Sequence, residues 1–354
     1  MHTCDVVIAG AGIIGLSVAI ELRRAGATVA VLDRGEPGRE ASSAAAGMLV
    51  VDDPETDPKL KPLTRLSASI YPAFVEELEL RSGIKVELEN RGTLYIGRSD
   101  EDLSSHPLST TELQSLEPGL ADLPRVCFLQ EQTVNPLLLL QAALVAAKRM
   151  GVVVHHEALV ERVSVAATCD LEVRTSAGPY AAATFVNCAG AWAADIKGVA
   201  VPSHPVKGQM LTVIPADSNL RHVVRSREVY LLPRRTGRIL IGASVQQAGF
   251  DKTVEPDVIQ QLHQAASNLV PSLGEAKMIE AWAGLRPGSP DGLPIIGPGS
   301  LPGTYVATGH FRNGILLAPI TAAVISELIQ GRQSRIDLLP FSPSRFVGNR
   351  ALAG

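Results

Sequence analysis

The sequence predicts an α/β fold in which a parallel-sheet domain is interleaved with a second domain built on an antiparallel sheet. Strand–glycine turn–helix signals lie near both ends and in the middle of the chain, antiparallel strand patterns are inserted between them, and no clean linker divides the chain. The 354 residues, 46% of them hydrophobic, are enough for a large core without disulfide staples.

Composition argues against several classes of protein. Lys and Arg number 32 and Asp and Glu 36, a formal net charge of −4, so we expect no nucleic-acid partner. The N-terminus lacks the basic start of a signal peptide, and the apolar runs at 6–20 and 314–325 are shorter than a membrane span. We therefore expect a cytoplasmic protein outside the membrane. No metal-ligand spacing is found between the four cysteines, which are Cys4, Cys127, Cys169 and Cys188. We therefore expect reduced thiols and no metal site.

The chain begins with a strand, a glycine turn, a helix and a second strand. The first strand is expected over 6–9, and the helix over 13–25, where apolar residues recur at helical spacing. Gly26 stands where a helix end favours a residue without Cβ. The second strand, 28–32, is a continuous apolar run, as in a parallel sheet that is buried on both faces.

Similar patterns predict the remaining elements. Asn135 followed by Pro136 marks a helix start, and that helix should end at Met150. Alternating segments at 86–88 and 93–96 predict two strands with a turn between them. Further helices are expected at 63–82, 256–269 and 315–330, and further strands within 152–165, 171–175, 180–186, 206–245 and 304–307.

The turn Gly10-Ala11-Gly12-Ile13-Ile14-Gly15 has the spacing of a dinucleotide-binding motif. Its first glycine makes the turn, the second lets backbone approach a pyrophosphate, and the third lets helix and strand pack closely. The helix that follows offers free N–H groups to the phosphates. Asp33 can accept hydrogen bonds from ribose hydroxyls. The alternative is a glycine-rich structural turn.

The motif does not separate FAD from NAD, and two other segments favour FAD. Backbone amides of the small-residue run 42–47 could lie against a flavin edge, although a plain loop would look the same. The strand 185–190 ends in Ala-Gly, as chains that pass under a bound FAD often do.

The turn 309–314 opens the last helix, whose N-terminus suits the negative charge of a reduced flavin, and Arg312 adds a positive charge.

Three further side chains are candidates for substrate chemistry. A planar guanidinium at Arg286 could bind a carboxylate with two hydrogen bonds, or could form an ion pair within the protein. Strand alternation puts Glu228 and Tyr230 on one face, where Tyr230 either meets a substrate carboxylate or packs into the core. Arg312 could form a surface salt bridge instead of lying beside a flavin.

These segments together resemble the glycine oxidase branch of the D-amino-acid oxidase family of flavoenzymes. The resemblance covers nearly the whole chain and is most specific at 43–48, 282–288 and 309–319. It implies two interleaved domains, a Rossmann-type FAD-binding domain and an antiparallel-sheet α+β substrate-binding domain. The FAD-binding domain would comprise 1–83, 133–198 and 286–354, and the substrate-binding domain 84–132 and 199–285.

The resemblance also implies roles for single residues. Arg286 would bind the substrate carboxylate with Tyr230 as its helper, Arg312 would line both flavin and substrate, and Val50 would disfavour bulky amino acids. Glu228 is a speculative proton acceptor, and no obligatory catalytic acid or base is expected. The chain has no cysteine after Cys188, so FAD should be non-covalent. The residues implied to hold it are Gly10, Gly12, Ile13, Ile14, Gly15, Asp33, Arg34, Ala41, Ser42, Ser43, Ala46, Gly47, Met48, Val160, Gly190, His310, Phe311, Arg312, Asn313, Gly314, Ile315 and Leu316.

The activity that the resemblance implies is oxidation of glycine and other small amines, such as sarcosine and small D-amino acids. A hydride would pass from Cα to flavin N5, and the products would be an imine or glyoxylate, ammonia, and hydrogen peroxide from oxygen. A role in thiamine-thiazole biosynthesis and a homotetramer are also implied. Two alternatives stay open: a D-amino-acid dehydrogenase of the same fold with another electron acceptor, and a non-catalytic flavin-binding protein.

Overall fold

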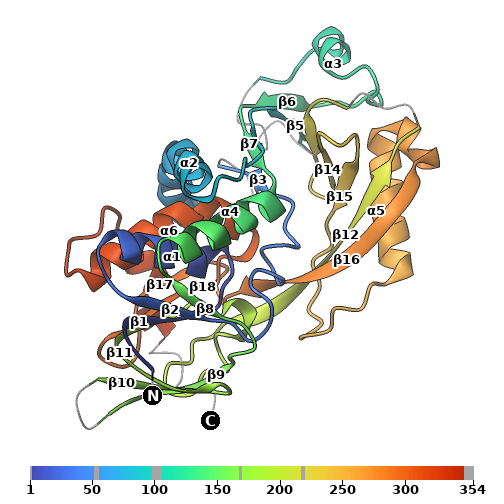
Figure 1. Ribbon diagram of the computed structural model, residues 1–354. Helices are drawn as coiled ribbons and strands as arrows, with labels where there is room; N and C mark the ends of the chain where they lie inside the picture. Colours follow the sequence, from blue (N-terminus) through green and yellow to red (C-terminus); the bar gives the residue numbers. More distant parts are fainter. Residues whose placement is uncertain (1, 52–55, 98–105, 167–169, 217–219, 347–354) are drawn as a thin grey trace.

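The computed structural model describes residues 2–51, 56–97, 106–166, 170–216 and 220–346 (Figure 1). Within these residues the strands form sheets of eight, seven and three strands. The eight-stranded sheet carries most of the helices, and the seven-stranded sheet extends away from it (Figure 1). This arrangement confirms the predicted α/β fold. The second sheet is antiparallel as predicted except between β5 (Thr93–Ile96) and β13 (Val223–Arg225), which pair in parallel.

The eight-stranded sheet has the order β17-β18-β11-β1-β2-β8, with β10 paired to β11 and β9 paired to β10. The central strands run parallel to one another, as predicted. The strands are β1 (His2–Ala9), β2 (Val29–Leu32), β8 (Val153–His155), β9 (Val160–Val165), β10 (Leu171–Thr175), β11 (Gly178–Asn187), β17 (Ile295–Pro298) and β18 (Thr304–Thr308).

Both faces of this sheet are buried, because alternate residues of β1 and β2 belong to two different core clusters. Val6 and Ile8 pack in the cluster with the helices, whereas Val7 and Ala9 pack against residues of β9 and β10. The continuous apolar run of β2 is explained in the same way. The covering helices are α1 (Ile13–Arg24), α2 (Lys61–Ser82), α4 (Pro136–Arg149) and α6 (Gly314–Ile329).

The seven-stranded sheet has the order β16-β12-β15-β14-β13-β5-β6. Helix α5 (Pro256–Leu269) packs on one face against alternate residues of β12 such as Leu211 and Val213. Helix α3 (Thr110–Leu116) lies at the far end, beyond β5 and β6 (Figure 1). The strands are β5 (Thr93–Ile96), β6 (Val126–Leu129), β12 (His204–Ile214), β13 (Val223–Arg225), β14 (Tyr230–Pro233), β15 (Ile239–Gly242) and β16 (Lys277–Gly288).

The predicted hairpin around 90–92 is wrong. β4 (Leu88–Glu89) pairs with β7 (Gln132–Val134), which also pairs with β3 (Met48–Leu49) in the three-stranded sheet. β5 pairs instead with β13 and β6 in the seven-stranded sheet. Alternation identified both strands but could not assign their partners, because pairing is decided by segments at least 30 residues away. The chain at 90–92 therefore passes from one sheet to another.

Several local predictions are confirmed. The side-chain oxygen of Asn135 accepts hydrogen bonds from the N–H groups of Leu137 and Leu138 at 3.1 and 3.4 Å, so it caps α4. Helix α5 has the predicted limits. Cys4, Cys127 and Cys188 are free thiols, and Cys169 lies outside the described residues.

Among the described residues one helical stretch, 311–329, is long and apolar enough to cross a membrane by length and composition alone. Helix α6, which makes up most of it, packs against α1 and α2, and 67% of the apolar window is buried. Its composition is therefore explained by its place in the core.

The predicted domain limits can be compared with the strands. The strands of the eight-stranded sheet lie within 2–9, 29–32, 153–165, 171–187 and 295–308. Those of the seven-stranded sheet lie within 93–96, 126–129, 204–214, 223–242 and 277–288. β16 continues across the predicted limit between 285 and 286. The limits themselves stay a prediction.

Candidate cofactor and substrate cavity

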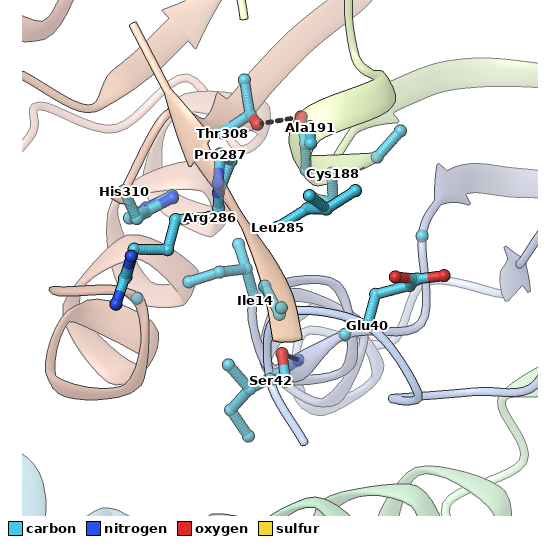
Figure 2. A pocket seen from close by; sticks show the side chains of 18 of the residues that line it. Ile14, Glu40, Ser42, Cys188, Ala191, Leu285, Arg286, Pro287, Thr308 and His310 are labelled. Atoms are coloured by element: carbon cyan, nitrogen blue, oxygen red, sulfur yellow. Dashed lines mark hydrogen bonds between the residues drawn. The ribbon is translucent and has the colours of Figure 1, made fainter. Parts of the chain in front are cut away.

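A cavity of about 800 Å³ is lined by residues of both large sheets. Its walls include the carboxyl ends of β1 and β2, the segment 40–50, the start of α6, and residues of β12, β14 and β16. Figure 2 shows Arg286 and His310 on one side of the cavity and Glu40 across from them. Chain segments far apart in sequence therefore meet at one site.

The glycine turn forms one part of the wall. Gly10 has φ +101°, and a Cβ on it would lie 2.3 Å from the Cys188 carbonyl oxygen. A Cβ on Gly15 would lie 1.9 Å from the Gly10 carbonyl oxygen, so this glycine serves close packing of helix and strand and does not line the cavity. At the start of α1, the N–H of Ile13 donates to the Ser42 hydroxyl at 3.1 Å. Gly12 and Ile14 on either side line the cavity, and the N–H groups at a helix N-terminus suit an anion.

Asp33 follows β2 and lies beside this turn. Its carboxylate accepts hydrogen bonds from the N–H of Ala11 at 2.7 Å and the N–H of Gly35 at 2.9 Å. Burial raises the pKa of this carboxyl group, and the two amide donors act in the opposite direction. The guanidinium of Arg34 lies 4.3 Å from the ring centre of Trp192, which stacks on Phe250. The polar and aromatic groups at this end suit an adenosine moiety.

On the cavity face of the seven-stranded sheet, Gly208 of β12 pairs in register with Gly284 of β16. Two side chains lie over this bare patch. A Cβ on Gly284 would lie 2.5 Å from the Ala44 Cβ, and one on Gly208 would lie 2.2 Å from Nη1 of Arg286. The Arg286 guanidinium therefore lies directly on the Gly208 backbone.

Arg286 is held by backbone carbonyl groups. Its Nη1 donates to the Ser244 carbonyl at 3.0 Å and lies 3.5 Å from that of Lys207. Burial lowers the pKa of this guanidinium, Tyr230 raises it, and Arg312 lowers it further. Since an arginine side chain stays charged in proteins, this half-buried cation is available to an anionic ligand.

Tyr230 of β14 has only 8% of its surface exposed, and its hydroxyl donates to the Met210 sulfur at 3.3 Å. Burial raises the pKa of this phenol to about 12, even though Arg286, Arg312 and Arg234 lower it. The hydroxyl is therefore protonated at neutral pH and able to donate. Three guanidinium groups influence it, so this end of the cavity is positively charged.

The turn before α6 closes the cavity on a third side. Its residues 310–315 all line the cavity, and Arg312 is exposed. His310 is buried and its Nε2 lies 3.0 Å from the Thr321 hydroxyl. Burial lowers the pKa of His310 to about 3, so the imidazole is neutral. Its side chain anchors the turn to α6, and His310 is one of the residues that line the cavity.

Most of the residues predicted for the site line this one cavity. The four predicted at the substrate are Arg286, Tyr230, Arg312 and Val50, and those predicted at the cofactor are Gly10, Gly12, Ile13, Ile14, Asp33, Arg34, Ala41, Ser42, Ala46, Gly47, Met48, Val160, Gly190, His310, Phe311, Arg312, Asn313, Gly314 and Ile315. Gly15, Ser43 and Leu316 are not lining residues; Leu316 is buried in the core and accepts a hydrogen bond from Ser67.

The speculative role of Glu228 as a proton acceptor does not fit the structure. β14 begins at Tyr230, so strand alternation does not extend back to Glu228, which lies in the turn after β13. Its side chain is exposed and is not among the residues that line the cavity.

Sequence reasoning missed other lining residues, among them Gly208, Met210, Arg225 and Trp192. An isolated glycine within an apolar strand signals a close backbone approach, and this signal could have identified Gly208. The buried Arg225, paired with Glu131 at 3.1 Å, had no such signal, because its position depends on the register of β13 with β14.

These groups fit FAD. The turn at Gly10 and Gly12 leaves room for a pyrophosphate at the helix N-terminus, Asp33 offers oxygens to ribose hydroxyls, and the N–H groups of Ala45 and Gly47 have no acceptor within the described part of the chain. Arg312 and the start of α6 supply positive potential at another part of the cavity wall.

Fold and cavity define a flavin-dependent oxidoreductase, and comparison with known proteins agrees. Residues 5–328 match the FAD dependent oxidoreductase family (DAO), so the chain belongs to this family and FAD is its cofactor. Glycine oxidase from Pseudomonas aeruginosa is 33% identical over 96% of this chain and 98% of its own. The crystal structure of glycine oxidase from Geobacillus kaustophilus matches with a TM-score of 0.92 at 31% identity, covering 98% of this chain and 99% of that one. The bifunctional protein ThiO/ThiG of Trichormus variabilis is 36% identical over 97% of this chain and 55% of its own length.

Proposed function

We propose that this flavoenzyme oxidises glycine and other small amines, including sarcosine and small D-amino acids, to the imine, which hydrolyses to glyoxylate and ammonia when glycine is the substrate. The observation that carries the proposal is that the Arg286 guanidinium lies on Gly208 of β12, near the protonated Tyr230 hydroxyl. The similarity to glycine oxidases supports it.

Arg286 and Tyr230 fix the carboxylate of the amino acid. A guanidinium binds a carboxylate with two parallel hydrogen bonds, and the phenol donates a further one. Because Gly208 and Gly284 carry no side chains, the Arg286 guanidinium and Ala44 can lie directly against the sheet. Val50 and Met48 line the same cavity and limit the size of the side chain that fits. The geometry therefore favours small amino acids.

FAD, when bound, accepts the hydride that leaves Cα and passes two electrons to oxygen, which gives hydrogen peroxide. The main contribution of the chain is to hold the amine in one orientation, which by itself lowers the barrier substantially. Its second contribution is electrostatic. The guanidinium groups of Arg286, Arg312 and Arg234 disfavour a further positive charge nearby, so they lower the pKa of the bound ammonium and favour the neutral, reactive amine. The proton of the ammonium leaves to solvent water, so this step requires no side-chain base.

Replacing Arg286 by alanine tests this function. Loss of one partner of a buried ion pair costs ~3–5 kcal/mol, which is about 10²-fold or more in kcat/KM for glycine. The exposed Arg332 is a control, since Arg332→Ala should leave kinetics unchanged. A loss below about tenfold in Arg286→Ala, with FAD still bound, would reject the carboxylate clamp.

The hydrogen peroxide formed per turnover separates an oxidase from a dehydrogenase that uses another electron acceptor. We expect one peroxide per oxidised amine in air. The similarity to ThiO/ThiG supports a role in making the thiazole of thiamine, which we propose as the use of the imine. A homotetramer in the cytoplasm is likewise a proposal, and light scattering would test the subunit number.

A further inference from the structure

Two side chains of the seven-stranded sheet hold carbonyl groups of the segment 44–48 from outside the cavity. Arg234, directly after β14, donates from Nη2 to the Ala46 carbonyl at 2.5 Å. Trp282 of β16 donates from Nε1 to the Ala44 carbonyl at 3.3 Å. Neither side chain lines the cavity, whereas Ala44 and Ala46 do. Both donors therefore act on the cavity wall from behind.

The held carbonyls determine where the next N–H groups point. The peptide bonds after Ala44 and Ala46 are trans, and across a trans peptide the C=O and the following N–H point in opposite directions. The N–H groups of Ala45 and Gly47 therefore point away from Trp282 and Arg234. No acceptor for either is found among the described residues, and both residues line the cavity.

Arg234 also fixes the conformation at Gly47. Its Nη1 donates to the Val134 carbonyl at 3.3 Å, and the N–H of Val134 donates to the Gly47 carbonyl at 2.8 Å. Gly47 has φ +84°, and a Cβ on it would lie 2.0 Å from the Val134 oxygen. One guanidinium thus joins Ala46 to Val134 and holds the Ala46–Gly47 peptide in a single orientation.

We propose that Arg234 and Trp282 are positioning residues that present the N–H groups of Ala45 and Gly47 as hydrogen-bond donors to the polar edge of the flavin ring. Fixed donors stabilise the negative charge that the ring gains on reduction. Arg234 would thereby set the affinity and the reduction potential of FAD without touching the substrate. The inference depends on FAD as the cofactor and not on which amine is oxidised.

The test compares Arg234→Met with Arg235→Met in the full-length protein. Methionine keeps a long stem and removes the donors, and Arg235 is a matched neighbour whose Nε lies 3.8 Å from Glu89 at the surface. In Arg234→Met we expect the dissociation constant of FAD, measured by flavin fluorescence, to rise about tenfold or more. We also expect a shifted visible spectrum and a lower midpoint potential. Reduced flavin bound tenfold less tightly relative to oxidised flavin corresponds to about 30 mV.

Arg235→Met should leave all three flavin properties unchanged. Wild-type affinity, spectrum and potential in Arg234→Met would overturn the proposal. If Arg234→Met does not fold, Trp282→Phe carries the test, because it removes the indole N–H donor and keeps an aromatic ring. We expect a lower potential, and an unchanged potential would overturn the proposal. None of these measurements uses an amine, so their outcome is independent of whether glycine is the substrate.

Discussion

Replacing Gly208 by alanine tests the substrate site through a single methyl group. The new Cβ would lie 2.2 Å from Nη1 and 2.4 Å from Cζ of Arg286, far below ordinary contact distance. The guanidinium is the end of a flexible side chain and must move by about 1 Å, a displacement that is large for a group that orients a substrate. The three atoms nearest to the new Cβ all belong to this side chain.

The expected cost follows from the contact that this displacement breaks. Arg286 loses its hydrogen bond to the Ser244 carbonyl, now 3.0 Å long, and its alignment with the substrate carboxylate. A hydrogen bond to a charged group contributes about 1.5–3 kcal/mol, so kcat/KM for glycine should fall roughly 10- to 100-fold. The lost hydrogen bond also lowers the free energy of unfolding, and the preference for alanine over glycine within a strand, about 0.5–1 kcal/mol, offsets only part of that loss.

Steady-state kinetics and thermal unfolding of four proteins separate these effects: wild type, Gly208→Ala, Arg286→Ala and the double variant. Once Arg286 is absent, the methyl group has nothing to displace, so Gly208→Ala should have little further effect in that background. Gly119→Ala is the control, because a Cβ there meets no atom within 4 Å. An equal loss of kcat/KM from Gly208→Ala in both backgrounds would refute the reasoning.

Three further substitutions have distinct expected results. Tyr230→Phe removes a buried donor and with it about 1–3 kcal/mol of transition-state stabilisation, so kcat/KM for glycine should fall accordingly. Unchanged kinetics would make Tyr230 a packing residue. Tyr71→Phe removes a buried hydroxyl that has no hydrogen-bond partner in the described part of the chain, so urea unfolding should show equal or higher stability, and a loss above about 1 kcal/mol would contradict this. His310 has a folded pKa of about 3, below its unfolded value. Its contribution to the free energy of unfolding is therefore complete above pH 6.5, and it is lost toward pH 3 at up to about 1.4 kcal/mol per pH unit. His310→Gln should flatten the fall in stability over this range, and an unchanged slope would show that His310 does not cause it.

The sequence predicted best those features that depend on neighbouring residues. The glycine turn at 10–15, the Asn135 cap and the limits of α5 are local, since each follows from the conformational preferences of a few adjacent residues. Alternation and apolar runs likewise identified most strands of both large sheets, whereas β6, β16 and β17 were not predicted. The predicted cofactor residues therefore meet at one cavity because the elements that carry them formed where expected.

Pairing between distant segments could not be predicted in the same way. The strands β4 and β5 joined different sheets, and Glu228 fell outside its strand, because partners far along the chain decide pairing and strand ends. The Gly208–Gly284 pair depends on the register of β12 with β16, which neither segment encodes alone. Arg234 was missed for the same reason, since its acceptors at Ala46 and Val134 lie in other parts of the chain.

The central claim is that the cavity brings a small amino acid to a bound flavin. Anaerobic mixing of the purified yellow protein with glycine, followed at the visible flavin band, tests it most directly. We predict that the band bleaches with glycine and that Arg286→Ala bleaches far more slowly at the same concentration. A band that persists with glycine, sarcosine and D-alanine, in protein whose flavin dithionite still reduces, would contradict the claim.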